Sequence, residues 1–579
     1  MFSIKTNPLY RLFFFLSKKR KRQLYFLIFL LILNGVLESF SIASIVPFLS
    51  IIASPNDVQK VPGFGIFFQT LNIDDSPNFL FFFTVLFCIF IILSTFFRLF
   101  NLRYIIKLTA NLEIELSKLI FKNNIFQSYI DYTKRNSSEV ITITIDKVSS
   151  TASALRSFFN LIGSSILSLF ILGSLLLINW KIVFYGIVFL LVYYLLTYKK
   201  VRKKLSEHGI LLASLGPRRL RLLQEVFFGF RDVIVNGTQK IYIDIFNKID
   251  IDIKTRDANA AFISIFPRYL IEGVVILTLV IVGFNLSQLN FNLISLIPLF
   301  GSVLYSFQRL LPLVQQIYAT WANYRTKYPS ICEVVEELEK NNNQKEIILR
   351  NREFIFNKNI VLKNIDFSYE ESNLILENIN LKINKGDHVG IYGETGSGKS
   401  TFLDILIGLI PPSKGNILID DVDIYREKSS NLWTTKIAHV AQNIYLKEGT
   451  IAENIAYGES PNEINYDLLV NSAKSAQIYK FIEKSNKGFE TSVGEGGIRL
   501  SGGQRQRIVI ARALYRAREI LVLDEATSAL DHDTEESIIE SIKKHNNLTI
   551  LMVTHRLKSL RICDRVFKVC GNQIIEEKK

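Results

Sequence analysis

The chain has 579 residues, which is too long for a single hydrophobic core, so several domains are expected. Hydrophobic residues make up 49% of it. They include uncharged apolar runs of roughly 17–25 residues, the length that crosses a bilayer as a helix, which exclude a purely soluble protein. The net charge of +15 does not indicate nucleic-acid binding, because Lys and Arg gather in cytoplasmic loops of membrane proteins and face anionic headgroups.

The N-terminal region predicts a first membrane span. Residues 1–23 carry seven basic residues and no acidic one, which places the N-terminus in the cytoplasm. The apolar run at about 24–52 is too long for a signal peptide, and no small-residue cleavage site follows it. The acidic connector 54–78 is expected outside. Its apolar part, 63–71, is too short to cross and predicts an interfacial helix or a collapsed loop.

Hydropathy predicts five further spans, at about 79–99, 158–180, 182–198, 269–287 and 293–313. The connection 103–156 carries eight basic and five acidic residues, and the connection 199–265 carries thirteen basic and seven acidic residues. Both are therefore expected in the cytoplasm, together with both termini. A helix rises about 1.5 Å per residue, so these connections reach well below the membrane.

The composition changes after the last span. Residues 324–339 are amphipathic, and "EKNNNQKE" (339–346) is typical of a linker. Short β-type runs, glycine turns and amphipathic helices then fill 347–579. The predicted fold is a six-span α-helical membrane domain, residues 1–338, followed by an α/β P-loop domain at 347–579.

A phosphate-binding motif opens the soluble domain. "GETGSGKS" (393–400) fits G-x-x-x-x-G-K-S and stands between the strand-like "VGIY" and the helical "TFLDILIGLI", as the motif requires. Backbone N–H groups and the helix N-terminus would hold phosphate oxygens. Lys399 would reach the β and γ phosphates, and the Ser400 hydroxyl would bind Mg²⁺. The predicted nucleotide-binding residues here are Gly393, Glu394, Thr395, Gly396, Ser397, Gly398, Lys399, Ser400 and Thr401.

Other segments complete this site. In "EILVLDEATSALD" (519–531) an apolar strand ends in Asp524, which can hold Mg²⁺ through water, and Glu525, which can act as general base. "LSGGQRQR" (500–507) is a second helix start suited to phosphate. Gln442 and His555 each follow a strand-like run. Either residue alone is usually structural, but their order and spacing favour a functional role.

Together these segments resemble the ATP-binding cassette of ABC transporters over the whole domain. The matching positions are Walker A at 393–400, the Q-loop at Gln442, the signature at 500–504, Walker B at 519–524, the D-loop at 528–531 and His555. The resemblance implies ATP and Mg²⁺ as cofactors and ATP hydrolysis coupled to transport. It implies catalytic roles for Glu525, Gln442 and His555, and metal contacts from Ser400, Gln442 and Asp524.

The same resemblance implies how two copies cooperate. Tyr369 would stack on adenine, and a second chain in a head-to-tail homodimer would add Ser501, Gly502, Gly503 and Gln504 to the site. Six spans before one cassette is the order of an exporter half-transporter. Residues 123–134 and 224–237 would be coupling helices that dock on cassettes, and surface turns with no docking role are the alternative.

Three arginines inside the predicted spans point to the cargo: Arg98, Arg268 and Arg309. All three fall in the cytoplasmic half of the bilayer. A dimer would place six guanidiniums around one path, which suits a pyrophosphate or another anionic headgroup. Two alternatives stay open. Each arginine can reach the headgroups and need no ligand, or pair internally, with Glu272 and Glu38 as candidate partners.

The membrane half also resembles the PglK-type flippases, through "PRYLIEG", "RLLP" and an arginine late in the second span. This resemblance implies a flippase that moves a polyprenyl-diphosphate-linked oligosaccharide across the bacterial inner membrane by alternating access. Segment 63–71 would hold the lipid tail, although its length and charge depart from that group. The expected partners are a second copy, membrane lipids and an amphiphilic anionic substrate, with no nucleic acid.

Two other functions remain alternatives. The first is an exporter of another amphiphile, such as lipid A, another lipid or a drug. The second is a membrane receptor that uses the cassette as an ATP-gated switch. Glu525 and His555 argue against the receptor, because a switch needs no turnover.

Overall fold

The computed structural model describes residues 7–53, 76–288, 293–340, 354–369, 374–427, 429–516, 518–527, 530–543, 548–556 and 558–577. Within these ranges, it does not describe the side chains of residues 43, 45–53, 76–80, 83, 177–200, 202, 267–268, 271, 274–276, 278–280, 282–307 and 562. The chain divides into two units. One holds Met1–Gln127 and Lys134–Lys345, and the other holds Ser128–Thr133 and Glu346–Lys579.

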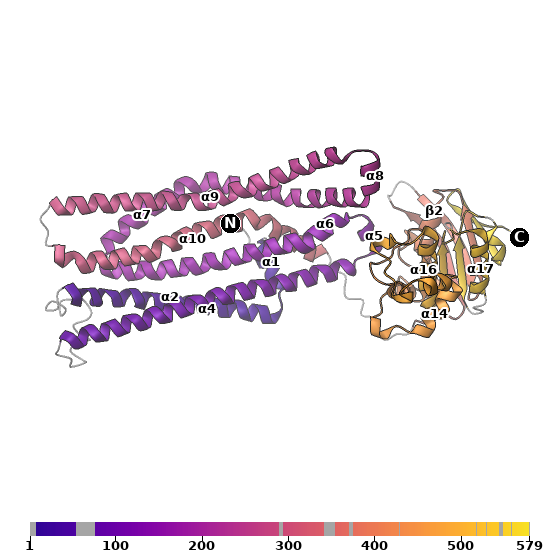
Figure 1. Cartoon of the computed structure of the whole chain (residues 1–579), viewed down its shortest axis with the longest axis horizontal. Coiled ribbons are helices and arrows are strands. Elements are labelled where there is room, and N and C mark those ends of the chain that lie inside the picture. The colour runs from indigo at the N-terminus through magenta and orange to yellow at the C-terminus, as the bar shows by residue number, and fades with distance from the viewer. Residues whose placement is uncertain are drawn as a thin grey trace. The chain divides into compact units, whose positions relative to one another are not determined.

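The first unit is a bundle of helices (Figure 1). They are α1 (Pro8–Phe15), α2 (Lys18–Ala53), α4 (Ser76–Ile125), α6 (Ser137–Thr142), the π-helical η3 (Ile143–Lys147), α7 (Val148–Phe228), α8 (Phe230–Val235), α9 (Gln239–Gln288) and α10 (Leu293–Lys340). Within the described residues, three stretches are long and apolar enough to cross a membrane: Lys18–Ile42, Thr84–Ile125 and Ser137–Leu176.

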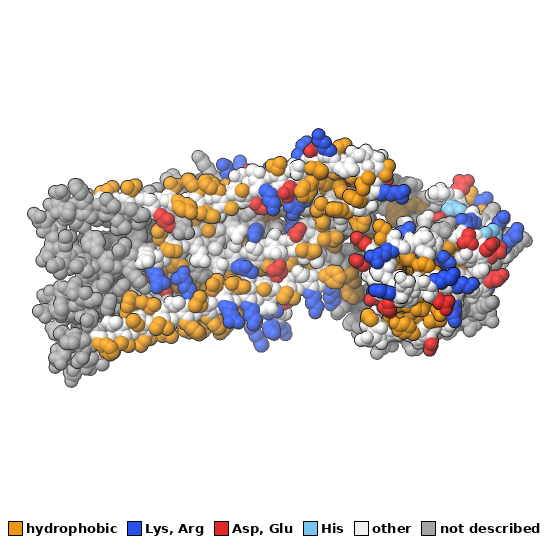
Figure 2. Space-filling model, in the orientation of Figure 1, with side chains coloured by type: hydrophobic (Ala, Val, Ile, Leu, Met, Phe, Trp, Pro, Cys, Tyr) orange, Lys and Arg blue, Asp and Glu red, His pale blue; other side chains and the backbone are white. Residues whose placement is uncertain are grey.

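The spans predicted at 182–198, 269–287 and 293–313 fall wholly or mostly on residues whose side chains are not described, and segment 63–71 lies outside the described residues. On α4, large hydrophobic side chains such as Phe81, Ile92, Phe96 and Leu99 are exposed. Figure 2 shows hydrophobic side chains running along the helices of this unit, as expected for a surface that faces lipid.

The third and fourth predicted spans belong to one helix, α7, which reverses its direction. A straight helix would separate residues 147 and 213 by about 100 Å, at about 1.5 Å per residue. Lys147 Nζ instead donates to the carbonyl oxygen of Ala213 over 2.6 Å. Figure 1 shows the two limbs of α7 running back along each other. The tight turn expected between these spans is therefore a reversal inside one helix.

Apolar stripes at helical spacing hold the bundle together. On α4 the stripe is Ile105, Leu108, Leu112, Leu116 and Ile120, and on α10 it is Ile331, Val334, Val335 and Leu338. These side chains recur every three or four residues, so they lie on one face of each helix. They join one buried cluster with residues of α1, α2 and α7.

Ion pairs fix the last turns of α10 beside this cluster. Arg135 donates twice to the Glu337 carboxylate, over 2.8 and 2.7 Å, and Lys147 pairs with Glu333 at 2.9 Å. Arg11 of α1 pairs with Glu339. The Glu337 side chain is only 1% exposed, so its charge depends on Arg135 for compensation.

The second unit contains two sheets. A four-stranded antiparallel sheet has the order β2-β1-β4-β5, and a six-stranded, mostly parallel sheet has the order β10-β9-β3-β8-β7-β6. The strands are β1 (Asn359–Ser368), β2 (Leu374–Asn384), β3 (His388–Gly393), β4 (Lys414–Ile419), β5 (Val422–Asp423), β6 (Ile437–Val440), β7 (Ile520–Asp524), β8 (Thr549–Val553), β9 (Arg565–Cys570) and β10 (Gln573–Glu577).

The helices of this unit are α5 (Tyr129–Thr133), α11 (Lys399–Leu406), α12 (Ser430–Thr434), α13 (Ile451–Ile455), α14 (Tyr466–Ser475), α15 (Tyr479–Lys484), α16 (Gly502–Tyr515) and α17 (His532–Lys543). Of the two predicted coupling segments, 123–134 contains α5, whose Ile130 packs against a hydrophobic cluster of this unit. The other, 224–237, contains α8 of the first unit.

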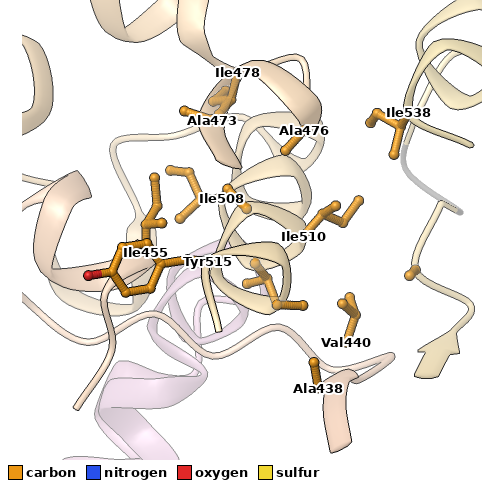
Figure 3. Packing of buried hydrophobic residues seen from close by; sticks show 14 of the residues in the cluster. Ala438, Val440, Ile455, Ala473, Ala476, Ile478, Ile508, Ile510, Tyr515 and Ile538 are labelled. Atoms are coloured by element: carbon orange, nitrogen blue, oxygen red, sulfur yellow. The ribbon is translucent and has the colours of Figure 1, made fainter. Parts of the chain in front are cut away.

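Strand alternation builds two cores on opposite faces of the six-stranded sheet. Ile520 and Val522 of β7 join a cluster with β1, β2, β4 and α11. Leu521 and Leu523 of the same strand join a cluster with α13, α14, α16 and α17. Figure 3 shows part of the second cluster, with Ile508 and Ile510 on α16 and Val440 on β6 among its members. Helices α11 and α16 therefore cover opposite faces.

We predict that Gly209→Ala destabilises the helical unit. A Cβ at Gly209 of α7 would stand 2.2 Å from the carbonyl oxygen of Thr326 on α10, so the two backbones would have to separate. We expect a cost of about 1–3 kcal/mol and a lower melting temperature of the purified protein. The matched control is Gly173→Ala on α7, where a Cβ meets no described atom within 4 Å. Equal melting temperatures for both variants would contradict the close approach.

Candidate nucleotide site

The loop between β3 and α11 is shaped by glycine. Gly396 and Gly398 have φ angles of +84° and +95°, which side chains disfavour. A Cβ at Gly393 would stand 2.5 Å from the carbonyl oxygen of Val569. The loop therefore turns tightly between strand and helix, as a phosphate cradle requires.

Lys399 begins α11 and folds back over this loop. Its Nζ donates to the carbonyl oxygens of Gly393 and Glu394, over 2.9 and 2.7 Å. Burial lowers the pKa of Lys399, and the charges of Glu525 and Asp524 oppose that change. Among the described residues, the buried Ser397 hydroxyl has no hydrogen-bond partner. A cation and an unpartnered hydroxyl inside a glycine loop fit the phosphates of a nucleotide.

Three parallel strands deliver the catalytic candidates to one edge of the sheet. Strands β6, β7 and β8 are neighbours and run parallel, so their carboxyl ends coincide. Gln442 follows β6, Glu525 follows β7 and His555 follows β8. Gln442 Nε2 donates to Glu525 Oε2 over 2.7 Å, and His555 Nε2 pairs with Glu525 Oε1. The structure thus brings all three predicted catalytic residues together.

The backbone also positions Glu525. Its φ of +48° is unusual for a residue other than glycine and is typical of strained functional sites. The Glu525 N–H donates to the carbonyl oxygen of Val553 over 2.9 Å. Gln506 Nε2 of α16 donates to the Glu525 carbonyl oxygen over 3.3 Å. Sequence reasoning missed Gln506, although it begins the buried stripe Gln506, Val509, Ile510 and Ala513.

Asp524 is the last residue of β7, directly before Glu525, and is 8% exposed. Burial, followed by the charge of Glu525, raises the pKa of Asp524, while Lys399 and His555 oppose the rise. The charge of Asp524 also acts on the carboxyl group of Asp404 on α11. Burial and the charge of Asp524 raise the pKa of Asp404 to about 6. Asp524 thus adds negative charge at the carboxyl end of β7.

The oxygen donors of Ser400, Gln442 and Asp524 are the kind that Mg²⁺ prefers, together with substrate phosphates. Tyr369 directly follows β1 and is 49% exposed, and the ring of Phe367 contacts its ring edge-on. An exposed ring of this kind suits stacking on a base. The residues present therefore fit an ATP–Mg²⁺ complex.

The signature segment starts α16 with a capping box. Ser501 Oγ accepts from the Gln504 N–H over 3.3 Å, and Gln504 Oε1 accepts from the Ser501 N–H over 2.9 Å. Gly502 and Gly503 form the first turn. Because α16 and α11 cover opposite faces of the sheet, this helix start and the Lys399 loop belong to different sides of the domain.

Glu535 is a second residue that sequence reasoning missed. It is 6% exposed and lies on the buried stripe of α17 with Ile538, Ile539 and Ile542. Its carboxylate accepts from Thr527 Oγ1 over 2.8 Å and Ser559 Oγ over 2.6 Å, and pairs with Arg556 at 3.0 Å. Glu535 thus joins the segment after Glu525 to the segment after His555.

The three candidate cargo arginines have different settings. Arg98 of α4 is exposed. The Arg309 side chain of α10 is 27% exposed and pairs with Glu38 of α2, with 3.3 Å between Nη1 and Oε1. The Arg268 side chain lies outside the described ones. Glu272 accepts from Gln315 Nε2 over 3.2 Å. Internal pairing, one of the alternatives for these arginines, is therefore present at Arg309.

Comparisons with known proteins agree with this site. The family model described as "ABC transporter" matches residues 376–528. The ATP-dependent lipid A-core flippase of Wigglesworthia glossinidia brevipalpis is 31% identical over 452 residues, 75% of this chain and 74% of that protein. The heterocyst differentiation ATP-binding protein HepA of Nostoc sp. is 32% identical over 388 residues, 65% of this chain and 61% of that protein.

A solved structure extends the likeness to the whole fold. The structure of a bacterial Atm1-family ABC exporter with ATP bound covers 96% of this chain and 94% of its own, with a TM-score of 0.72. Its sequence identity is 20%, so the likeness concerns the fold.

We predict that Glu535→Gln lowers ATP hydrolysis roughly tenfold while nucleotide binding persists. The variant removes the charge that holds Arg556 and weakens the link between Thr527 and Ser559, and losing a buried partner costs about 1–3 kcal/mol. Steady-state ATPase and a fluorescent-nucleotide titration measure the two quantities. The control is Glu536→Gln, whose side chain is 68% exposed on the same helix. Equal rates for the two variants would remove Glu535 from this role.

We predict that Asp404→Asn changes how stability depends on pH. The pKa of Asp404 is raised to about 6 in the folded protein, so its contribution to stability is complete below the unfolded pKa of about 4. That contribution is lost as the pH rises through 6. The variant should melt at a higher temperature than the wild type at pH 7.5, and the difference should shrink toward pH 5. Differential scanning fluorimetry without nucleotide measures this, and a difference independent of pH would contradict it.

Proposed function

This chain belongs to the ABC transporter family, and from that premise we propose that it is an ATP-driven exporter that moves an anionic amphiphile across the bacterial inner membrane. The observation that carries the proposal is the convergence of Gln442 and His555 on Glu525, at the strand edge that also holds the Lys399 loop. A carboxylate oriented from two sides is suited to align and deprotonate a water molecule.

The residues divide the work of hydrolysis. Lys399 and the N–H groups of its loop bind phosphate oxygens, and the Tyr369 ring stacks on the adenine of ATP. Glu525 accepts a proton from the attacking water, while His555 and Gln442 keep its carboxylate aligned. Ser400, Gln442 and Asp524 would hold Mg²⁺, which would neutralise phosphate charge when bound.

We place α16 of a second copy against the nucleotide. Within one chain, α16 and α11, the helix that follows the Lys399 loop, lie on opposite faces of the sheet. A head-to-tail pair of cassettes would bring Ser501 of one copy to the phosphates held by the other. ATP would close the pair and hydrolysis would release it, which drives alternating access in the helical units. This organisation places both termini and both cassettes in the cytoplasm.

The named relatives favour a broad class of cargo. Relatives called lipid A-core flippases support an amphiphilic lipid with a large polar headgroup. A polyprenyl-diphosphate-linked oligosaccharide is a narrower candidate, and Arg98, Arg268 and Arg309 support it because guanidinium binds diphosphate in bidentate fashion. The Glu38–Arg309 pair weakens the narrower candidate, because that guanidinium already has a carboxylate partner.

The test is transport in proteoliposomes. A fluorescent polyprenyl-diphosphate saccharide, a fluorescent lipid A-type glycolipid and a zwitterionic phospholipid are followed separately by quencher accessibility. We expect ATP-dependent movement of at least one anionic lipid and none of the zwitterionic lipid. Glu525→Gln should keep ATP binding and lose at least about a hundredfold in hydrolysis. Movement of all three lipids, or of none, would contradict the proposal.

The triple replacement Arg98→Gln, Arg268→Gln and Arg309→Gln tests the narrower candidate. We expect transport of the diphosphate lipid to stop while basal ATPase persists, because the cassette is unchanged. Gel filtration shows whether the variant is folded. Persistent transport of the diphosphate lipid would show that the arginines do not bind its headgroup.

A further inference from the structure

The carboxylate of Glu38 is enclosed where three helices of the first unit meet. The residue is 6% exposed on α2. Its Oε1 faces Arg309 of α10 and its Oε2 accepts from the Ser94 hydroxyl of α4. Each carboxylate oxygen therefore has a partner from a different helix, which fixes the orientation of the group.

The surroundings make this charge depend on its partners. Ile42, one turn along α2, packs with Ile171 and Leu175 of α7 and with Leu310 and Leu313 of α10. Glu38 continues the buried face of α2 that includes Leu27, Leu31 and Asn34. A carboxylate among such side chains is stable only when it is paired.

The two partners differ in their access to other molecules. The Arg309 side chain is 27% exposed, whereas that of Glu38 is 8% exposed. An anion that reaches Arg309 therefore meets a guanidinium whose charge is compensated from its buried side. In an anionic membrane, phospholipid phosphates are abundant anions at the cytoplasmic surface, near the predicted position of Arg309.

We propose that Glu38 is an internal competitor that holds Arg309 until cargo arrives, so that the phosphate of bulk phospholipid does not occupy the headgroup site. A single phosphodiester charge does not replace the enclosed carboxylate. A headgroup with more than one negative charge and several acceptor oxygens does. Specificity then comes from a built-in element that disfavours the wrong ligand. This inference rests on the proposed function, because it assumes an anionic cargo.

The test uses wild type and Glu38→Gln in nanodiscs of phosphatidylcholine with increasing phosphatidylglycerol. Native mass spectrometry counts the phosphatidylglycerol that stays bound, and farnesyl diphosphate is the diphosphate probe, read by ATPase rate. Removing the competitor should lower the half-maximal probe concentration by up to about fivefold in phosphatidylcholine, the scale of one partly exposed charge pair. Added phosphatidylglycerol should raise that concentration in Glu38→Gln and leave it unchanged in the wild type.

Two further variants separate competition from loss of structure. Glu337→Gln breaks the ion pair with Arg135, which is also buried but lies beside another cluster. It should lower the melting temperature and leave the response to both lipids as in the wild type. Ser94→Ala removes one hydrogen bond from Glu38 and keeps its charge. It should lower the half-maximal probe concentration, as Glu38→Gln does, but by a smaller factor.

The outcomes distinguish this inference from the proposed function. Phosphatidylglycerol bound by Glu38→Gln and not by the wild type supports the competitor role, even when neither protein responds to the diphosphate probe. The lack of a response to the diphosphate probe would count only against a diphosphate cargo. Equal phosphatidylglycerol binding by Glu38→Gln and the wild type would overturn the inference, as would the same gain in Glu337→Gln.

Discussion

The alternation of side chains along β7 and β8 is the constraint on which the cassette depends. Leu521 and Leu523 face one hydrophobic cluster, and Ile520 and Val522 face the other, so the sheet must be covered on both sides. Helix α11 then covers one face of the sheet, and α16 covers the other. The carboxyl ends of the parallel strands then lie at one edge of the sheet, and this edge holds Asp524 and Glu525. The geometry of the nucleotide site follows from how the sheet is buried.

Buried charge sets the second constraint, and both units meet it by pairing residues that are far apart in sequence. Glu535 is enclosed by Thr527, Ser559 and Arg556, and Glu337 by Arg135. Breaking such a pair leaves an uncompensated charge in a poorly solvated place, which costs more than forming the pair gains. These contacts therefore fix the relative positions of elements within each unit more than they add net stability.

The sequence predicted those parts of the site that depend on local backbone. The glycine loop at 393–398 and the capping box at Ser501 are read from short motifs, and the structure shows the positive φ angles and hydrogen bonds that such motifs need. Helical stripes such as Leu108, Leu112 and Leu116 likewise follow from spacing alone. The convergence of Gln442 and His555 on Glu525 required the order of the strands, which only a family resemblance supplied.

Sequence reasoning missed Gln506 and Glu535 because their roles arise from tertiary contacts. Both share one signal, a polar side chain at a position of a helix stripe that is otherwise apolar, and Glu38 on α2 has the same signal. Gln506 and Glu535 were passed over because their partners come from other elements, whereas Glu38 was predicted as a partner of a membrane arginine. A polar residue on a buried stripe has to be stabilised by a partner, so the stripe itself identifies where a distant partner must lie.

Arg98 and Arg309 have different surroundings in the helical unit. Depth alone treated Arg98 and Arg309 as equivalent, but the first is exposed and the second is held by an enclosed carboxylate. Ser94, which donates to that carboxylate, lies one helical turn before Arg98 on α4. Helix α4 therefore carries both an exposed arginine and, one turn away, the hydroxyl that orients the Glu38 carboxylate toward Arg309.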